Sequence, residues 1–120
     1  MKAEVTRTFE FNAAHSLPAV PDGHKCRQIH GHNYTIEIAV SGSVDPAYGW
    51  VIDFGEMKDA VAPIIEELDH KYLNDIPGLE NPTAEYISRW IWRKLKPVIP
   101  GLVRVSVNES PATRCSYFGE

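Results

Sequence analysis

The chain has 120 residues, of which 43% are hydrophobic and 23% are charged, and its formal net charge is −4. This composition predicts a globular chain and excludes an intrinsically disordered one, and the length suits one domain spanning residues 1–120. The negative charge argues against nucleic acid or an acidic membrane as the main partner, although a small phosphorylated ligand needs only a few local cations.

Neither a membrane span nor a secreted protein is expected. The chain contains no apolar run of about 18 residues, and its strand-like start MKAEVTRTFEF lacks the apolar core of a secretory signal. Its two cysteines do not imply a disulfide framework. The prediction is therefore a cytoplasmic location.

The first half of the chain has the alternation of β-strands. Apolar and polar residues alternate over residues 4–12, which predicts a strand with one buried face. Residues 17–29 contain two prolines and a glycine and predict a loop. Alternation resumes over residues 30–41, which predicts a second strand, and a turn centred on Asp45-Pro46 follows it.

Helical periodicity follows in the second half. Asp53 and Glu56 have the N-cap and N3 spacing of a capping box, and they open a predicted helix in which Pro63 is unfavourable. After a loop, Asn81-Pro82 has the N-cap and N1 pattern of a second helix. The apolar side of that helix is predicted to contain Tyr86, Ile87, Trp90, Ile91 and Leu95.

The last part of the chain returns to strands. Pro97 and Pro100 end the second helix, and strands are predicted at residues 102–109 and 114–118. The order of elements is therefore ββααββ. Strands that flank a pair of helices indicate an α+β fold, in which four strands form an antiparallel sheet with both helices on one face.

Three histidines are expected at the ends of the first two strands, on their buried faces. His30 and His32 share a side with Tyr34, and continued alternation puts His15 on the apolar side of the first strand. If these strands pair antiparallel, the imidazoles meet. His-x-His on a strand places two Cα atoms about 6.5–7 Å apart, and three nitrogen ligands leave a coordination position open, as in catalytic zinc sites. The alternative for each histidine alone is a hydrogen-bonded core or surface residue.

A carboxylate ends the apolar face of the third predicted strand. Val103, Val105, Val107 and Glu109 share one side of residues 102–109. A carboxylate in such a place can accept two N–H donors from a flat heterocycle that carries an amino group. The alternative is that Glu109 lies beyond the sheet edge, in water.

Two further groups have potential catalytic chemistry. Cys26 lies in a loop with Lys25 and Arg27, whose positive charges favour a thiolate; the alternative is an unreactive loop thiol. Asp69 precedes His70 after the first helix, and an aspartate beside a histidine suggests an oriented base. Adjacent residues often point apart, so this pair alone is a weak signal.

Six stretches of the chain together resemble the 6-pyruvoyltetrahydropterin synthase family. They are FNAAHSLP, CRQIHGH, GWVIDFGEMK, LDHKYLND, NPTAE and the closing NES…YFGE. The likeness covers almost the whole chain. It is strongest to the bacterial branch, the 6-carboxy-5,6,7,8-tetrahydropterin synthases of the queuosine pathway, because three residues separate Cys26 from His30 and because GHKC contains that cysteine.

The resemblance implies a ligand set and a nucleophilic or acid–base thiol. His15, His30 and His32 match the zinc ligands of the family, in agreement with the argument from strand faces. Cys26 matches the catalytic thiolate, and no catalytic position departs from the family pattern.

The resemblance also implies roles for residues in the second half of the chain. Asp69 and His70 match a proton-relay pair, and Glu109 matches the acidic anchor of the pterin ring. Thr83 resembles a position that contacts the pterin; the alternative is an ordinary residue in the first turn of the second helix. Lys25 and Arg27 are candidates for binding the triphosphate; the alternative is that they are solvated loop charges.

The fold and reaction that the resemblance implies complete the expectation. The fold is the tunnelling fold, in which three chains close a barrel and two such rings stack as a hexamer with active sites between subunits. The reaction converts 7,8-dihydroneopterin triphosphate to 6-carboxytetrahydropterin with release of acetaldehyde and triphosphate, and Zn²⁺ is the cofactor. The alternatives are a pyruvoyl-type synthase, a dihydroneopterin aldolase, and a non-catalytic zinc- or pterin-binding module.

Overall fold

The computed structural model describes residues 1–120 and contains one four-stranded antiparallel sheet with strand order β1-β2-β3-β4. The strands are β1 Lys2–His15, β2 His30–Ser43, β3 Leu102–Ser110 and β4 Thr113–Tyr117. The helices are α1 Phe54–Leu68 and α2 Ala84–Leu95, and short 3-10 turns lie at η1 Lys25–Arg27 and η2 Leu73–Asp75. The predicted ββααββ order and antiparallel sheet are confirmed.

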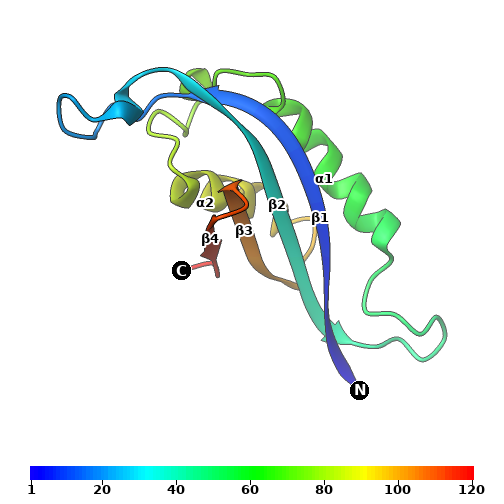
Figure 1. Cartoon of the computed structure of the whole chain (residues 1–120). Helices are drawn as coiled ribbons and strands as arrows, with labels where there is room; N and C mark the ends of the chain where they lie inside the picture. The colour runs from blue at the N-terminus through cyan, green and yellow to red at the C-terminus, as the bar shows by residue number, and fades with distance from the viewer.

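Both helices cover the same face of the sheet. Figure 1 shows the long, curved pair β1 and β2 extending past the shorter β3 and β4, with α1 along β1 and α2 beside β3 and β4. One core of 19 buried residues takes alternate side chains from the strands, such as Phe11 and Ile36, and the apolar sides of both helices, such as Val61 and Ile91. The prediction of a single domain remains a prediction, which this one core supports.

The alternation of β1 continues to its end, as the position of His15 requires. Side chains at the odd positions of the strand are at least half-buried, and the last of them, Phe11, Ala13 and His15, are buried. The strand therefore carries His15 into the core, next to the start of β2. No helix of the structure is both long enough and apolar enough to cross a membrane.

The start of α1 agrees with the sequence except in the detail of its cap. Asp53 is the N-cap, but its Oδ1 accepts a hydrogen bond from the N–H of Gly55, at 2.9 Å, rather than from Glu56. Pro63 lies inside the helix on its exposed side. Proline has no backbone N–H, so the carbonyl of Asp59, four residues earlier, has no helical donor. Asp59 is exposed to solvent.

The predicted start of the second helix was wrong by two residues. Thr83, not Asn81, is the N-cap of α2, because its Oγ1 accepts a hydrogen bond from the N–H of Tyr86, at 3.2 Å. Pro82 lies before the cap and is buried. The apolar side is also narrower than predicted, since Tyr86 is 41% exposed.

Candidate metal centre and active site

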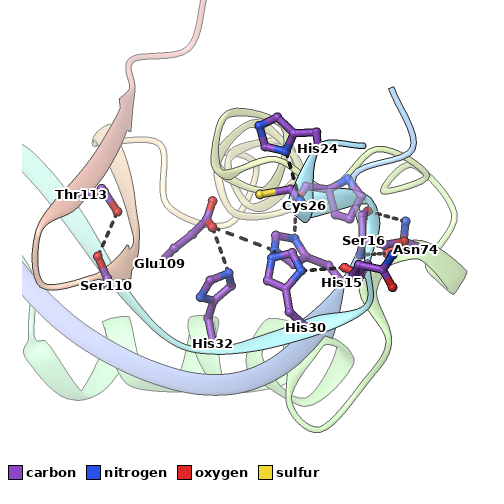
Figure 2. A network of polar contacts seen from close by, with 12 residues as sticks. His15, Ser16, His24, Cys26, His30, His32, Asn74, Glu109, Ser110 and Thr113 are labelled. Carbon is purple, nitrogen blue, oxygen red and sulfur yellow. Dashed lines mark hydrogen bonds and ion pairs between the residues drawn. The ribbon is translucent and has the colours of Figure 1, made fainter. Parts of the chain in front are cut away.

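The three predicted histidines meet where β1 ends and β2 begins. In the antiparallel register His15 pairs with His30 and Ala13 pairs with His32, so all three imidazoles project from the same face. Their potential ligand nitrogens lie within 4.8 Å of one another, and Figure 2 shows the rings converging. His15 is fully buried, and the other two are half-buried.

Two backbone carbonyls determine which nitrogens face the centre of this cluster. The Nδ1 of His15 lies 2.8 Å from the carbonyl of Pro82, and the Nδ1 of His30 lies 2.8 Å from the carbonyl of Gln28. A carbonyl only accepts, so both Nδ1 atoms donate. In the neutral rings both Nε2 atoms therefore present lone pairs, and these two atoms are 3.1 Å apart.

This arrangement suits a metal ion. Two lone pairs that face each other repel, and a cation bound by both removes the repulsion. The carbonyl partners of His15 and His30 also fix each ring and its tautomer, as the outer partners of metal-bound histidines do. The three histidines can therefore form a metal site, with donor atoms of the kind that Zn²⁺ and related ions prefer.

Glu109 lies against the histidines rather than beyond the sheet. Its Oε2 is 3.1 Å from the Nε2 of His32 and 3.9 Å from the Nε2 of His15. The closer contact is not aligned as a hydrogen bond, and the Nε2 of His32 has no hydrogen-bond partner. The carboxylate therefore lies against the imidazoles without a hydrogen bond to them, and its side chain stays 28% exposed.

Burial lowers the pKa of His15 and of His32 below the ordinary value. Desolvation outweighs the bond to the carbonyl of Pro82 at His15 and the charge of Glu109 at both rings. The histidines of the unfolded chain bind protons near pH 6.5, whereas His15 and His32 of the folded chain bind them only at lower pH, so acid favours unfolding.

We expect the melting temperature of the metal-free protein to fall as the pH is lowered from 7.5 to 5.5, which differential scanning fluorimetry with a chelator measures. The slope should be smaller in His32→Gln, and a flat or rising profile in the parent contradicts the assignment.

Cys26 lies beside the histidine cluster, in the turn η1. Its backbone N–H donates to the Nδ1 of His24, at 3.0 Å, and its carbonyl accepts from the N–H of Leu17, at 2.8 Å. Figure 2 shows the sulfur on the side of the three rings, directed toward the carboxylate of Glu109. The thiol is free and half-buried.

The two cations beside Cys26 differ in their surroundings. The Nη1 of Arg27 donates to the carbonyls of Pro18 and Val20 and lies 3.3 Å from Asp22, so this side chain holds the loop together. Lys25 is exposed, and only its backbone carbonyl is bonded, to the N–H of Gln28, so its side-chain amine is free. Their predicted role in binding triphosphate stays a prediction, and the geometry favours Lys25 for it.

Asp69 and His70 form a pair, but at a different place. The Nδ1 of His70 lies 2.9 Å from Asp69, and the N–H of Asn12 donates to the other carboxylate oxygen. That backbone donor first, and the His70 ring next, lower the pKa of Asp69. His70 has a left-handed φ of 59° and is bonded through its N–H to the carbonyl of Asn12.

The Asp69–His70 pair therefore lies at the free edge of β1. His70 borders a hollow of about 570 Å³ whose lining includes Asn12 and Asn33 of the outward face and also His32 of the cluster. Cys26 lies beside the inward-facing histidines instead. One chain thus brings together His15, His30, His32, Cys26 and Glu109. The polar partners of the relay pair are each other and the backbone of Asn12, not members of this group.

Several groups of the site have no signal in the sequence. The carbonyls of Pro82 and Gln28 orient two imidazoles, and a backbone carbonyl has no motif. Tyr34 lies under the cluster, with ring centroids 5.4 Å from His32 and 5.9 Å from His15. Its place on the histidine face was the only available signal. Thr83, predicted to contact a pterin, follows Pro82 at the start of α2.

Asn74 holds the residue that follows the first histidine. Its side chain accepts from the N–H of Ser16, at 3.0 Å, and donates to the carbonyl of Ser16, at 2.8 Å, as Figure 2 shows.

We expect Asn74→Ala to lower the free energy of unfolding by about 1–3 kcal/mol, because both backbone groups of Ser16 lose their partner in a half-buried place. Urea denaturation measures this. Asn33→Ala, which removes an exposed amide bonded to Asn12, should change it by less than about 0.5 kcal/mol; equal effects would contradict the expectation.

A model of the 6-pyruvoyl tetrahydropterin synthase family matches residues 4–120 of the chain. The chain belongs to this family. A 6-carboxy-5,6,7,8-tetrahydropterin synthase of Synechocystis sp. is 39% identical over an alignment of 120 positions. The alignment covers 95% of this chain and 92% of the relative. Membership of the 6-pyruvoyl tetrahydropterin synthase family confirms the resemblance and the expectation of an enzyme.

Other members of the 6-pyruvoyl tetrahydropterin synthase family carry different activities. A dihydroneopterin monophosphate aldolase of Pyrococcus furiosus is 34% identical over 105 residues, covering 88% of this chain and 85% of the relative. The solved structure of 6-pyruvoyl tetrahydropterin synthase from Caenorhabditis elegans superposes with a TM-score of 0.92 at 28% identity, covering 100% of this chain and 97% of that one. The family's fold is confirmed, and the specific reaction has to be argued from the site.

Proposed function

We propose that the protein is a zinc-dependent lyase that converts 7,8-dihydroneopterin triphosphate and water to 6-carboxy-5,6,7,8-tetrahydropterin, acetaldehyde and triphosphate, in queuosine biosynthesis. The observation that carries the proposal is the convergence of three imidazoles beside a free thiol and a carboxylate. The name and 39% identity of the Synechocystis relative favour the carboxy-type product. No redox cofactor is required, because oxidation of the side chain balances reduction of the ring.

In this proposal His15, His30 and His32 hold the zinc ion. Neutral imidazoles are ordinary zinc ligands, and three of them leave a position for a ligand from outside. Affinity order alone would favour copper, so the identity of the ion rests on the family. The bound ion supplies a Lewis acid that polarises a substrate oxygen.

The remaining residues bind the substrate and move protons. Glu109 accepts N–H donors from the amino-pyrimidine edge of the pterin, in a bidentate contact. The thiolate of Cys26, which lies beside the imidazoles, removes and returns protons at the carbons of the side chain. Thr83 contacts the pterin, and Lys25 and Arg27 are the candidates for the triphosphate.

Asp69 and His70 provide the second acid–base group from a neighbouring copy of the chain. Within one chain they lie at the edge of β1, away from Cys26. Both β1 and β4 are edge strands with unpaired backbone groups, which a barrel of three chains would pair. A homohexamer of two such barrels brings the relay pair of one chain to the thiol of another.

Product analysis tests the proposed reaction. The zinc-loaded protein is incubated with 7,8-dihydroneopterin triphosphate, and the products are identified by mass spectrometry. We expect 6-carboxytetrahydropterin and one acetaldehyde for each substrate consumed. An intact three-carbon side chain would show pyruvoyl-type chemistry, as the name of the Caenorhabditis elegans protein states for that enzyme. A hydroxymethyl pterin would show an aldolase, and no turnover would indicate a binding module.

A further inference from the structure

Tyr34 carries a buried polar group beside the histidine cluster. The residue is fully buried, and its ring stacks on Phe11 with centroids 4.8 Å apart. Its hydroxyl is buried without a hydrogen-bond partner. A buried donor without a partner destabilises a protein, and phenylalanine would fill the same volume without this penalty. The hydroxyl therefore needs a partner that another state of the site provides.

Glu109 is the acceptor that the strand register places across from Tyr34. The ladder between β2 and β3 ends at the pair Thr35–Asn108, so Tyr34 and Glu109 are the first residues beyond it, on the same face. A tyrosine hydroxyl is a hydrogen-bond donor and a carboxylate is an acceptor, so the two side chains are complementary.

In the structure the carboxylate of Glu109 points to the histidines. Its Oε2 lies 3.1 Å from the Nε2 of His32 without the alignment of a hydrogen bond. An ion held by the three histidines would use the Nε2 lone pair of His32. The carboxylate would then need another partner, and the hydroxyl of Tyr34 has none.

We propose that Tyr34 is a positioning residue, whose hydroxyl donates a hydrogen bond to the carboxylate of Glu109 when the three histidines hold their ion. This bond fixes the orientation in which the carboxylate accepts the N–H donors of a pterin. The inference rests on the proposed role of Glu109 as the pterin anchor. The proposed bond gives the buried hydroxyl of Tyr34 a partner when the ion is bound. It also accounts for the presence of a tyrosine where phenylalanine would avoid an unpaired hydroxyl.

The test uses Tyr34→Phe with zinc and neopterin as probes. Metal-free Tyr34→Phe is expected to melt at or above the temperature of the parent, because the unpaired hydroxyl is gone, and to bind zinc as the parent does. Binding of neopterin to the zinc-loaded variant, followed by fluorescence, should weaken about tenfold to a hundredfold, the usual effect of losing a hydrogen bond to a charged group. Tyr117→Phe is the matched control, since the Tyr117 hydroxyl donates to the carbonyl of Glu120 instead, and neopterin binding should not change.

A double-mutant cycle with Glu109→Gln separates this inference from the function on which it rests. Once Glu109 is replaced, Tyr34→Phe should cause no further loss of neopterin binding. If Glu109→Gln weakens binding and Tyr34→Phe does not, the inference about Tyr34 is wrong and the anchor stands. Equal losses from Tyr34→Phe in both backgrounds, or a lower melting temperature of the metal-free variant, also overturn it. If Glu109→Gln leaves binding unchanged, or if the parent does not bind neopterin, the anchor role fails and Tyr34 loses its proposed purpose.

Discussion

Replacement of Cys26 by alanine is expected to lower the turnover of 7,8-dihydroneopterin triphosphate by about 10²–10⁴-fold, the usual contribution of a positioned acid–base group. The backbone of the turn η1 forms its bonds to His24 and Leu17 without the thiol. The variant should therefore fold, melt near the temperature of the parent and bind zinc to the same extent. Product formation under saturating zinc and substrate measures the effect.

Cys115 provides the matched control for this substitution. It is the other cysteine of the chain, it is also free and half-buried, and it lies on β4 across from Val107. Cys115→Ala should turn over substrate at the parental rate. If Cys26→Ala also works at that rate, the thiolate mechanism is wrong, and a comparable loss in both variants would point to a general effect of removing a cysteine.

The second large effect is expected from the metal ligands. Zinc that binds only the folded chain stabilises it by RT ln(1 + [Zn]/Kd), which is about 2.7 kcal/mol at a hundredfold excess over Kd. His32→Ala removes one of the three converging nitrogens and should abolish most of this stabilisation, along with most of the bound zinc. Thermal melts with and without zinc, together with metal analysis after dialysis, measure both quantities.

His70→Ala tests whether that effect is specific to the cluster. Its imidazole is 78% exposed and is paired with Asp69 at the edge of β1, away from the three ligands. The variant should keep the zinc-dependent rise in melting temperature, although the proposed relay predicts loss of turnover. Zinc stabilisation that disappears equally in both variants, or in neither, would show that the ion does not bind where the three imidazoles converge.

The features that the sequence predicted well depend on local periodicity. Alternation along β1 and β2 is a property of neighbouring residues, and it placed His15, His30 and His32 on one face. Antiparallel pairing of consecutive strands then brings them together without further information. The same reasoning placed Glu109 on the buried side of β3, where its carboxylate meets His32.

The features that the sequence missed depend on competition between neighbours or on tertiary contacts. Asn81 and Thr83 are both good cap residues, and only the fold decides that the hydroxyl of Thr83 meets the N–H of Tyr86. The carbonyl of Pro82 reaches His15 from 67 residues away, which no local pattern records. The sequence also could not tell that the chain places Asp69 and Cys26 apart, because both lie in loops.

X-ray absorption at the zinc edge of the loaded protein tests the central claim most directly, namely that three imidazoles bind one ion and leave a place for a ligand from outside. We expect four light neighbours at about 2.0–2.1 Å, three of them with the scattering of imidazole and one that is exchanged when neopterin is added. A sulfur neighbour at about 2.3 Å would show that Cys26 is a ligand rather than a free thiol. That result, or a fourth protein nitrogen that closes the site, would contradict the proposed chemistry.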